Sequence, residues 1–329
     1  MVRFGVLGTS LITETFLNTA KHVKDFKLEA VYSRTLERAE EFGKKYGVDT
    51  FFTDLEEMAC SPQIDAVYIA TPNAYHAEQA ILFLRNKKHV LCEKPMAANA
   101  IEVKKMINCA KENEVLLMEA MIPTLLPNFK AIKDNLHKVG KIQHLFINYC
   151  KYSSRYDDYK AGIVHNAFNP LYANGALMDI GVYCLYPLIA LFGTPTKIAA
   201  TSKILDSGVD GRGNVLLSYP NKNAIVTYSK LSTSHLPSEI QGEDGSLIID
   251  KIATITKVKF YHKDGVVEDL SLKQDYPFMY YELKEFIDLI VMGKKESKVN
   301  SYKNSYNTML VMDEIRRQIG VYFPNDIYK

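Results

Sequence analysis

The chain has 329 residues, 47% of them hydrophobic and 24% charged, which is typical of a globular protein with enough apolar residues for two cores. Its 40 basic and 38 acidic residues give a net charge of +2 without blocks of like charge, which argues against a nucleic-acid or anionic-membrane partner. We therefore expect a small-molecule ligand.

The first part of the chain alternates short apolar runs with amphipathic stretches. The stretches carry apolar residues at helical spacing, as expected of repeated strand–helix units. The apolar runs lie at 2–8, 28–33, 65–71, 89–94 and 115–120. We predict an α/β Rossmann-type domain over residues 1–121, with a doubly wound parallel sheet.

The pattern changes after residue 121 to strand candidates that are joined by Gly-, Asn- and Asp-containing turns, as in an antiparallel sheet. The strand candidates lie at 141–152, 197–205, 213–219, 223–231, 238–250 and 256–262. Helical patterns lie at about 125–138, 175–192, 277–292 and 302–318. We predict a second, α+β domain over 122–329 with a large open, mainly antiparallel sheet. Its C-terminal helix could pack back on the first domain.

The first strand is followed by a turn with the sequence Gly8-Thr9-Ser10-Leu11-Ile12-Thr13. A helix that starts there offers N–H groups and a positive dipole end to a pyrophosphate. Of the glycines in the G-x-G-x-x-G fingerprint only the first is present, with Ser10 and Thr13 in the other two places. The turn fits either a dinucleotide site or an ordinary helix start capped by Ser and Thr.

The end of the second strand favours NADP over NAD as the cofactor. Enzymes that bind NAD usually place Asp or Glu there for the ribose 2′-hydroxyl, whereas a 2′-phosphate needs cations and hydroxyl donors. Here the strand ends in Ser33 and Arg34, and Arg38 follows one helical turn later. We predict that these three residues bind NADP(H). The alternative is a pair of ordinary solvated arginines.

A further group of cofactor candidates follows the strand at 65–71. Thr71, Pro72 and Asn73 form a turn at the carboxyl edge of the sheet, where such folds bind ligands. His76 lies in the next helical turn, where a histidine either reaches the ligand or packs locally. We include all four residues among the candidates for binding the cofactor.

Two short motifs further along the chain stand out for their chemistry. Glu93-Lys94-Pro95 ends a strand-like run, and Asp179 and Tyr183 are four residues apart in the segment NGALMDIGVYCLYPL. With the segment GEDGSLIID at 242–250, they resemble the glucose–fructose oxidoreductase / inositol dehydrogenase (Gfo/Idh/MocA) family over nearly the whole chain. The tyrosine form is most similar to the branch with glucose–fructose oxidoreductase, dimeric dihydrodiol dehydrogenase and NADP-dependent xylose dehydrogenases.

The resemblance implies an NAD(P)-dependent oxidoreductase that transfers a hydride between NADP(H) and a sugar, polyol or cyclic diol. It also implies a cis peptide bond before Pro95. A proton must move with the hydride, and a tyrosine, with a pKa of about 10, needs a nearby ammonium to act at neutral pH. We expect Tyr183 to transfer the proton, Lys94 to adjust its pKa and bind substrate, and Asp179 to orient both. Lys94 and Tyr183 could exchange roles. Glu93, Lys94 and Met121 complete the candidates for cofactor binding.

Candidates for substrate binding come from the polar loop 151–170, which precedes the helix that carries Asp179. They are Arg155, His165 and Asn169 of this loop, together with Tyr183 of the helix itself. One departure from the family follows Met121, where relatives often continue with a stretch such as Trp-Thr-Arg-Phe. Here Ile122-Pro123-Thr124 follows, and the arginine that would border the nicotinamide or the substrate is missing.

Two other functions fit parts of the sequence. The incomplete glycine fingerprint and the missing arginine would suit a non-catalytic NADP(H)-binding sensor, although a sensor has no need of Lys94, Asp179 and Tyr183. A methyltransferase also binds an adenosine ligand at a first turn. Ser33 and Arg34 in place of an acid, and the antiparallel second half, argue against it.

The remaining expectations concern location and partners. The chain starts directly in a strand-like run without the pattern of a signal peptide, and its 5 cysteines are widely spaced without metal-ligand spacing. We expect a cytoplasmic protein with reduced, buried cysteines, no metal and no membrane contact. Strands 197–205, 213–219 and 223–231 leave one sheet face apolar, and the family resemblance implies a homodimer or larger homo-oligomer through that sheet.

Overall fold

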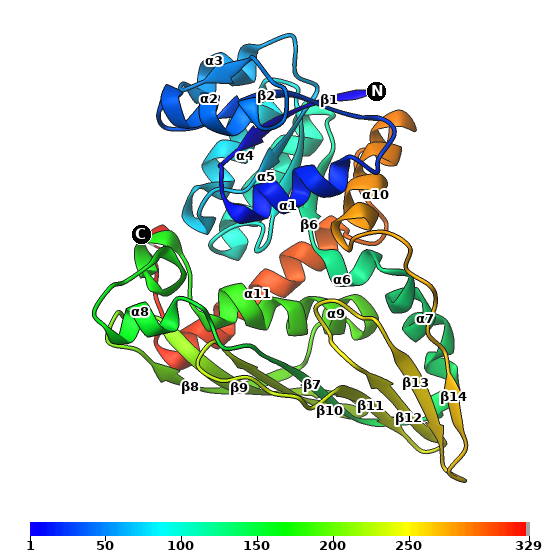
Figure 1. Ribbon diagram of the computed structural model, residues 1–329. Helices are drawn as coiled ribbons and strands as arrows, with labels where there is room; N and C mark the ends of the chain where they lie inside the picture. The colour runs from blue at the N-terminus through cyan, green and yellow to red at the C-terminus, as the bar shows by residue number, and fades with distance from the viewer. Residues whose placement is uncertain (327–329) are drawn as a thin grey trace. The chain divides into compact units, whose positions relative to one another are not determined.

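The computed structural model describes residues 1–326 and divides the chain into two compact units (Figure 1). The first unit contains Met1–Met121 and Tyr276–Tyr302, and the second contains Ile122–Asp275 and the chain from Lys303 onward. The first segment of the first unit ends at Met121. Residues 276–302, however, return to the first unit, although the sequence assigned them to the second.

The first unit is built on a six-stranded sheet with the order β3-β2-β1-β4-β5-β6. All neighbouring strands are parallel, which confirms the predicted Rossmann-type sheet. The strands are β1 (Val2–Leu7), β2 (Phe26–Tyr32), β3 (Phe51–Phe52), β4 (Ala66–Ile69), β5 (His89–Glu93) and β6 (Leu117–Ala120). The helices are α1 (Leu11–Ala20), α2 (Leu36–Lys44), α3 (Leu55–Cys60), α4 (His76–Arg85), α5 (Ala100–Asn113) and α10 (Met279–Val291).

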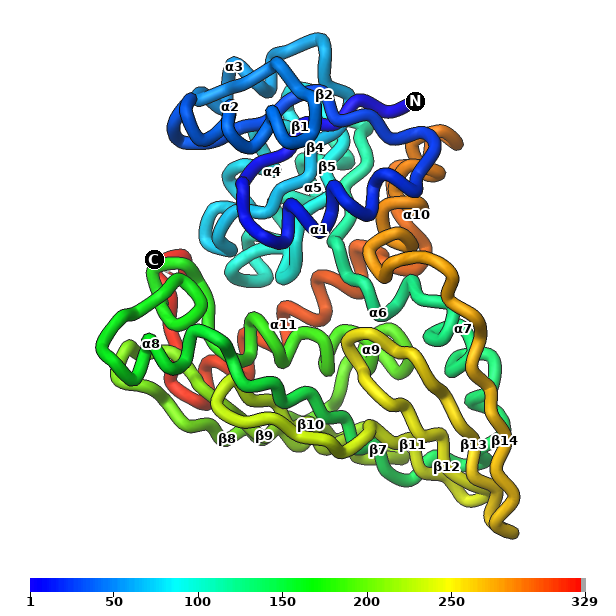
Figure 2. Tube along the Cα trace, in the orientation of Figure 1, coloured from blue at the N-terminus to red at the C-terminus, as the bar shows by residue number. Residues whose placement is uncertain are grey.

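Helix α10 belongs to the first unit because it contacts β1 and α1, and the segment after it is bonded to the end of β6. The ring of Phe286 lies 5.9 Å from that of Phe4 in β1, and Figure 2 shows α10 beside α1. The side-chain amide of Asn300 then donates to the backbone oxygens of Glu119 at 3.1 Å and Met121 at 3.0 Å. Helical spacing predicts the helix itself, but it does not show which sheet the apolar face of that helix covers.

The second unit contains an eight-stranded sheet with the order β14-β13-β12-β11-β7-β10-β9-β8. Only β10 and β7 are parallel, so the prediction of a mainly antiparallel sheet is confirmed. The strands are β7 (Ile142–Cys150), β8 (Lys197–Ile204), β9 (Asp210–Tyr219), β10 (Lys222–Ser229), β11 (Ser238–Gly242), β12 (Gly245–Ile249), β13 (Val258–His262) and β14 (Val267–Asp269). The helices are α6 (Ile122–Leu125), α7 (Pro127–Asn135), α8 (Tyr156–Lys160), α9 (Val182–Phe192) and α11 (Tyr302–Ile319).

Helices α7, α9 and α11 lie on the same side of this sheet, and its other face is open (Figure 1). Helix α11 packs on the second unit, because Gln318 bonds through its side chain to the backbone of Ala200 and Ile198 in β8, both at 2.9 Å. Tyr186 of α9 and Ser305 of α11 are linked by a 3.3 Å hydrogen bond. The single strand candidate at 238–250 is a hairpin of β11 and β12.

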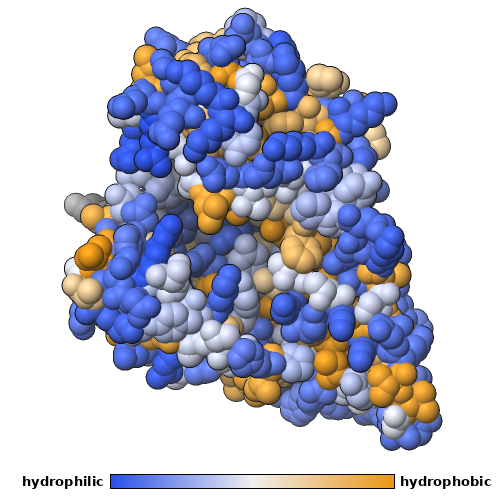
Figure 3. Space-filling view, viewed as in Figure 1, coloured by the Kyte–Doolittle hydropathy of each residue, from blue (hydrophilic) through white to orange (hydrophobic). Residues whose placement is uncertain are grey.

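The surface of the second unit is mostly hydrophilic in the view of Figure 3, with small hydrophobic patches such as that over the β13 and β14 tip. On the open face, Leu216 and Ile225 are directly paired across β9 and β10 and are 46% and 49% exposed. The stretch Pro170–Phe192 is long and apolar enough to cross a membrane, but 72% of its apolar 18-residue window is buried inside the protein, as in a core helix.

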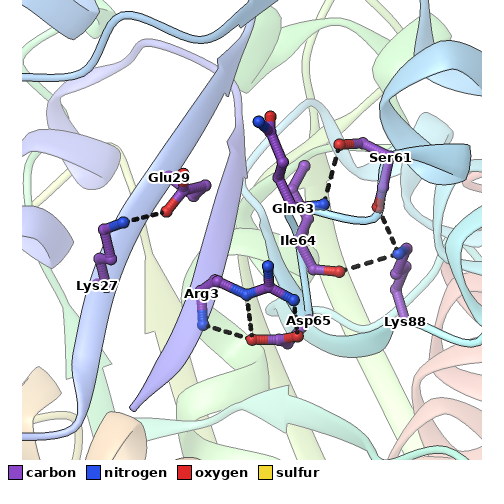
Figure 4. A network of polar contacts seen from close by, with 8 residues as sticks. All are labelled: Arg3, Lys27, Glu29, Ser61, Gln63, Ile64, Asp65 and Lys88. Atoms are coloured by element: carbon purple, nitrogen blue, oxygen red, sulfur yellow. Dashed lines mark hydrogen bonds and ion pairs between the residues drawn. The ribbon is translucent and has the colours of Figure 1, made fainter.

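A polar network joins the amino ends of β1, β4 and β5, at the edge opposite the candidate cofactor turn (Figure 4). The guanidinium of Arg3 binds both carboxylate oxygens of Asp65, at 3.0 and 2.7 Å, and its hydrogen bond holds the pKa of Asp65 below the usual value. Lys88 donates to the backbone oxygens of Ser61 and Ile64. A cavity of about 470 Å³ lies beside this network. Because Arg3 and Lys88 already bind protein groups, we interpret the network as structural: it connects the ends of neighbouring strands.

All five cysteines are free. Four are buried, but Cys60 at the end of α3 is exposed, so the expected burial is wrong for that residue.

Candidate active site

The turn after β1 lies close to the backbone that follows β4. Gly8 has φ +101°, and a Cβ atom there would lie 2.7 Å from the backbone oxygen of Ala70. Ser10 is the N-cap of α1, but its side chain makes no capping hydrogen bond. The first-turn N–H groups are therefore not satisfied by Ser10, and the turn suits an anionic group. Leu11 and Ile12 lie beside it with side chains 77% and 39% exposed.

The helix that follows β2 is bonded to the same turn through Arg38. Its Nε donates to Oγ1 of Thr9 at 2.8 Å, so a residue of α2 reaches the turn that follows β1. Ser33 is buried, and its N–H donates to Phe52 in β3 at 3.2 Å. Arg34 is exposed. The structure thus brings Thr9 and Arg38 together at the carboxyl edge of the sheet.

His76 joins the loop after β4 to the loop that contains Lys94. Its imidazole is fully buried, with Nε2 2.8 Å from the oxygen of Thr71 and Nδ1 2.9 Å from the oxygen of Pro95. Burial lowers the pKa of His76, and a neutral imidazole can donate to only one of these carbonyl groups at a time. His76 therefore holds two loops together, and its ring presents no exposed surface to a ligand.

The other candidates after β4 have local partners. The hydroxyl of Thr71 donates to Oε1 of Gln79 at 2.6 Å. Pro72 precedes a single turn of 3-10 helix, Asn73–Tyr75, in which Asn73 is 8% exposed.

The peptide bond between Lys94 and Pro95 is cis, as the family resemblance implied. Just before it, the buried carboxylate of Glu93 accepts a hydrogen bond from the hydroxyl of Tyr68 at 2.5 Å and another from the N–H of Lys94 at 3.1 Å. Glu93 thus fixes the backbone that carries the lysine. Met121, the last cofactor candidate, is fully buried.

A second buried carboxyl group, that of Glu282, interacts electrostatically with Glu93. Glu282 of α10 is 0% exposed, and neither of its oxygens has a hydrogen-bond partner among the described residues. Burial, and then the charge of Glu93, raise the pKa of Glu282 well above its ordinary value. Burial of Glu282 therefore favours its protonated form. Sequence reasoning did not find it, because a glutamate in an amphipathic helix ordinarily faces solvent.

In the second unit, Asp179 lies in a π-helical turn, Leu177–Gly181, that leads directly into α9. Such turns are rare and often occur at functional sites. The side chain of Asp179 is 35% exposed, and Tyr183 is half-buried. The ring of Tyr183 packs edge-on against that of Tyr149 in β7, with 5.7 Å between centroids.

Sequence reasoning missed Lys230, which is the ion-pair partner of Asp179. Its Nζ donates to Oδ2 of Asp179 at 2.6 Å, and the lysine side chain is only 2% exposed. A signal was present in the sequence, since Ala224, Val226 and Tyr228 alternate as inward residues of β10 and Lys230 continues that phase. A lysine at an inward position needs a partner.

Asp210 was also missed, and it anchors the start of the π-helical turn. Its Oδ2 accepts a hydrogen bond from the N–H of Leu177 at 2.7 Å, and the residue is 1% exposed. Burial raises the pKa of Asp210 to about 6.

The predicted substrate residues of the loop 151–170 have roles in the loop itself. Nε2 of His165 lies 2.7 Å from Oδ2 of Asp158, and Oδ1 of Asn169 accepts a hydrogen bond from the N–H of Leu171 at 2.9 Å. Arg155 is exposed just before α8.

Comparison with known proteins identifies both parts of the chain. Residues 2–121 match a family model described as an oxidoreductase family with an NAD-binding Rossmann fold, and residues 135–248 match a GFO/IDH/MocA C-terminal domain. Together these matches cover more than half of the chain.

Curated relatives match over nearly the full length. The scyllo-inositol 2-dehydrogenase (NADP(+)) IolU of Bacillus subtilis (strain 168) is 50% identical over 326 residues, which are 99% of each chain. The trans-1,2-dihydrobenzene-1,2-diol dehydrogenase of Mus musculus is 31% identical over 336 residues, again 99% of each. Among solved structures, the 3-ketoreductase KijD10 from Actinomadura kijaniata in complex with NADP and TDP-benzene has a TM-score of 0.86. It is 24% identical and covers 98% of this chain and 99% of its own, so it shows the shared fold.

Proposed function

We infer that this chain, which belongs to the GFO/IDH/MocA family of oxidoreductases, is an NADP(H)-dependent dehydrogenase or reductase of a cyclic polyol such as scyllo-inositol. Its full-length relatives include dehydrogenases that act on CH–OH groups, so the chain is an NAD(P)-dependent oxidoreductase and the sensor alternative has no support among them. The observation that carries the proposed substrate and cofactor is the 50% identity to a scyllo-inositol 2-dehydrogenase over 99% of both chains.

The residues at the carboxyl edge of the first sheet fit a phosphorylated dinucleotide. The uncapped first turn of α1 suits the pyrophosphate, and Gly8 keeps the backbone after β1 free of a side chain. Arg38 and Arg34 provide guanidinium groups for a 2′-phosphate, a role for which arginine geometry is well suited. When bound, NADP⁺ accepts the hydride from the carbinol carbon.

The proton chemistry is assigned to Lys94, Tyr183 and Asp179. Oxidation breaks the C–H and O–H bonds of the alcohol and forms a carbonyl group; two electrons leave with the hydride, and the proton passes to a base. We assign that base to Tyr183, with the Lys94 ammonium stabilising its phenolate and contacting the substrate oxygen. Asp179 orients them. Lys94 could exchange roles with Tyr183, as either group can carry the proton to solvent.

Assembly and location are part of the same proposal. The paired Leu216 and Ile225 on the open sheet face offer apolar area to a second copy, so we propose a homodimer or larger homo-oligomer through that face. We also propose that the enzyme acts in the cytoplasm.

A direct test combines cofactor binding with a substrate screen. The purified chain is titrated with NADPH and NADH by fluorescence, and inositols, cyclic diols and aldoses are then screened for NADP⁺ reduction by absorbance. We expect turnover of an inositol, and losses of about 10²-fold or more in kcat for Tyr183→Phe and Lys94→Met. Tyr261→Phe is the control, because Tyr261 is an exposed residue of β13. Cofactor binding without turnover of any alcohol would instead favour the sensor.

A further inference from the structure

Lys230 is a buried cation that lies outside both sequence motifs of the proposed active site. Transfer of an ammonium group out of water is costly unless protein groups replace the lost hydration. Here Nζ donates to Oδ2 of Asp179 at 2.6 Å and to the backbone oxygen of Ala167 at 3.1 Å. It also lies 4.7 Å from the centroid of the Phe168 ring, a distance at which the ring face attracts a cation. The surroundings are therefore built for a charged lysine.

The backbone of Lys230 is fixed as firmly as its side chain. Its N–H donates to the oxygen of Gly211 at 3.0 Å, and its own oxygen accepts from the N–H of Ser153 at 2.9 Å. Lys230 is thus held between the start of β9 and the start of the loop that precedes the Asp179 helix. A side chain whose backbone is held by hydrogen bonds in this way can fix the position of its partner.

The π-helical turn is consequently held at two points. Asp210 binds the N–H of Leu177 at the first residue of the turn, and Lys230 binds the carboxylate of Asp179 two residues later. Asp179 remains 35% exposed, so the carboxylate is anchored on its buried side and reaches the surface of the unit on the other. Tyr183 follows one helical turn later.

We propose that Lys230 is a positioning residue of the active site, which fixes the carboxylate of Asp179 so that Asp179 can orient Tyr183 and the substrate. This inference rests on the proposed function for its kinetic consequences, but the ion pair itself does not. An adjacent ammonium stabilises a carboxylate, and a misplaced catalytic group is costly in rate.

The kinetic test is a double-mutant cycle with Lys230→Met and Asp179→Asn, measured with NADP⁺ and scyllo-inositol. We expect Lys230→Met to lower kcat about 10- to 100-fold, with little change in the Kd of NADPH, which binds the other unit. In the Asp179→Asn background, Lys230→Met should lower kcat by less than about twofold, because the carboxylate through which Lys230 acts is absent. Equal losses in both backgrounds, or none in either, would overturn the proposal.

Two further variants separate positioning from folding. Lys230→Arg keeps the positive charge and should recover part of the lost kcat, whereas a purely steric role predicts that the larger side chain is no better than Met. Lys197→Met, at an exposed position of β8, is the control and should match the wild type.

A measurement without turnover keeps this inference distinguishable from the proposed function. The ionisation of Asp179 is followed by carboxyl ¹³C NMR in the wild type and in Lys230→Arg and Lys230→Met, with folding checked by circular dichroism. We expect the titration midpoint of Asp179 to rise by about one pH unit or more in Lys230→Met and to stay near the wild-type value in Lys230→Arg. An unchanged midpoint in a folded Lys230→Met would refute the ion pair, whereas a raised midpoint in an enzyme inactive on all alcohols would refute only the proposed function.

Discussion

The Nε of Arg38 donates a hydrogen bond to Oγ1 of Thr9 at 2.8 Å, which connects the first turn of α2 to the turn after β1. The two residues are 29 positions apart, and they meet because β1 and β2 are parallel neighbours whose carboxyl ends lie at one edge. If the neighbouring turn binds the pyrophosphate, as we propose, a guanidinium at this edge is suited to a ribose 2′-phosphate.

The preference for NADP over NAD can be tested at Arg38 and Arg34. Replacing either with Ala should weaken NADPH binding about 10-fold or more, because a charge-assisted hydrogen bond to the phosphate is lost. NADH, which lacks the phosphate, should bind nearly as before. Fluorescence titration gives both Kd values, with Arg212→Ala, exposed on β9, as the control. An equal loss for the two cofactors would contradict the assignment.

Gly8→Ala and Gly47→Ala form a matched pair for the turn after β1. Both glycines have positive φ, +101° and +70°, so alanine strains the backbone at each. At Gly47 the added Cβ meets nothing within 4 Å, whereas at Gly8 it would lie 2.7 Å from the oxygen of Ala70. We expect Gly8→Ala to be the less stable variant by about 1–3 kcal/mol and to lose cofactor affinity. Urea unfolding and NADPH titration check this; equal stability would show that the loop adjusts.

The sequence predicts both sheets of this fold because strand patterns are local. Alternating apolar residues identify β7, β9 and β10, and repeated strand–helix units identify the parallel sheet. The place of α10 could not be predicted in the same way, because it depends on a contact between Phe286 and Phe4 across most of the chain. β3 has only two residues, too few for a periodic pattern.

Candidate site residues could be proposed from the sequence where a motif combines residue type with position. Lys94, Asp179 and Tyr183 were proposed from such short motifs, whereas the buried residues near them were not. Lys230 and Glu282 resemble ordinary surface residues until the fold buries them, and only the alternation in β10 hints at the first. His76 was predicted as a residue of the cofactor site, but its two carbonyl partners are set by tertiary structure.

His76→Leu tests whether the link between the Thr71 and Pro95 loops supports cofactor binding. Leucine fills the buried space but removes the N–H that the imidazole donates to one of the two carbonyl groups, so we expect a loss of about 1–3 kcal/mol in stability. The Kd of NADPH should rise as well, because both loops lie at the cofactor edge of the sheet. His144→Leu, at an exposed position of β7 in the other unit, is the control. Unfolding by urea and NADPH titration give the two quantities; a destabilised variant with unchanged affinity would mean that the link is structural only.

Glu282 should make the stability of the protein depend on pH. Burial and the charge of Glu93 raise its pKa in the folded state well above 4.5, so above that pH the folded protein holds a proton that the unfolded chain releases. The contribution of this group is fully present below about pH 4.5 and is lost as the pH rises toward and through the folded pKa. One such proton changes the free energy of unfolding by about 1.4 kcal/mol per pH unit in that window.

Glu282→Gln replaces the titratable carboxyl group with an amide that does not titrate and nearly preserves the volume of the side chain. We therefore expect the variant to gain stability relative to the wild type as the pH is raised from about 5 to 8, with a difference that grows by as much as about 1.4 kcal/mol per unit. Urea unfolding across this range measures the difference, and Glu37→Gln, exposed on α2, should show no such trend. A pH-independent difference between Glu282→Gln and the wild type would mean that Glu282 is already ionised in the folded protein. The buried carboxylate would then need a partner that neutralises its charge.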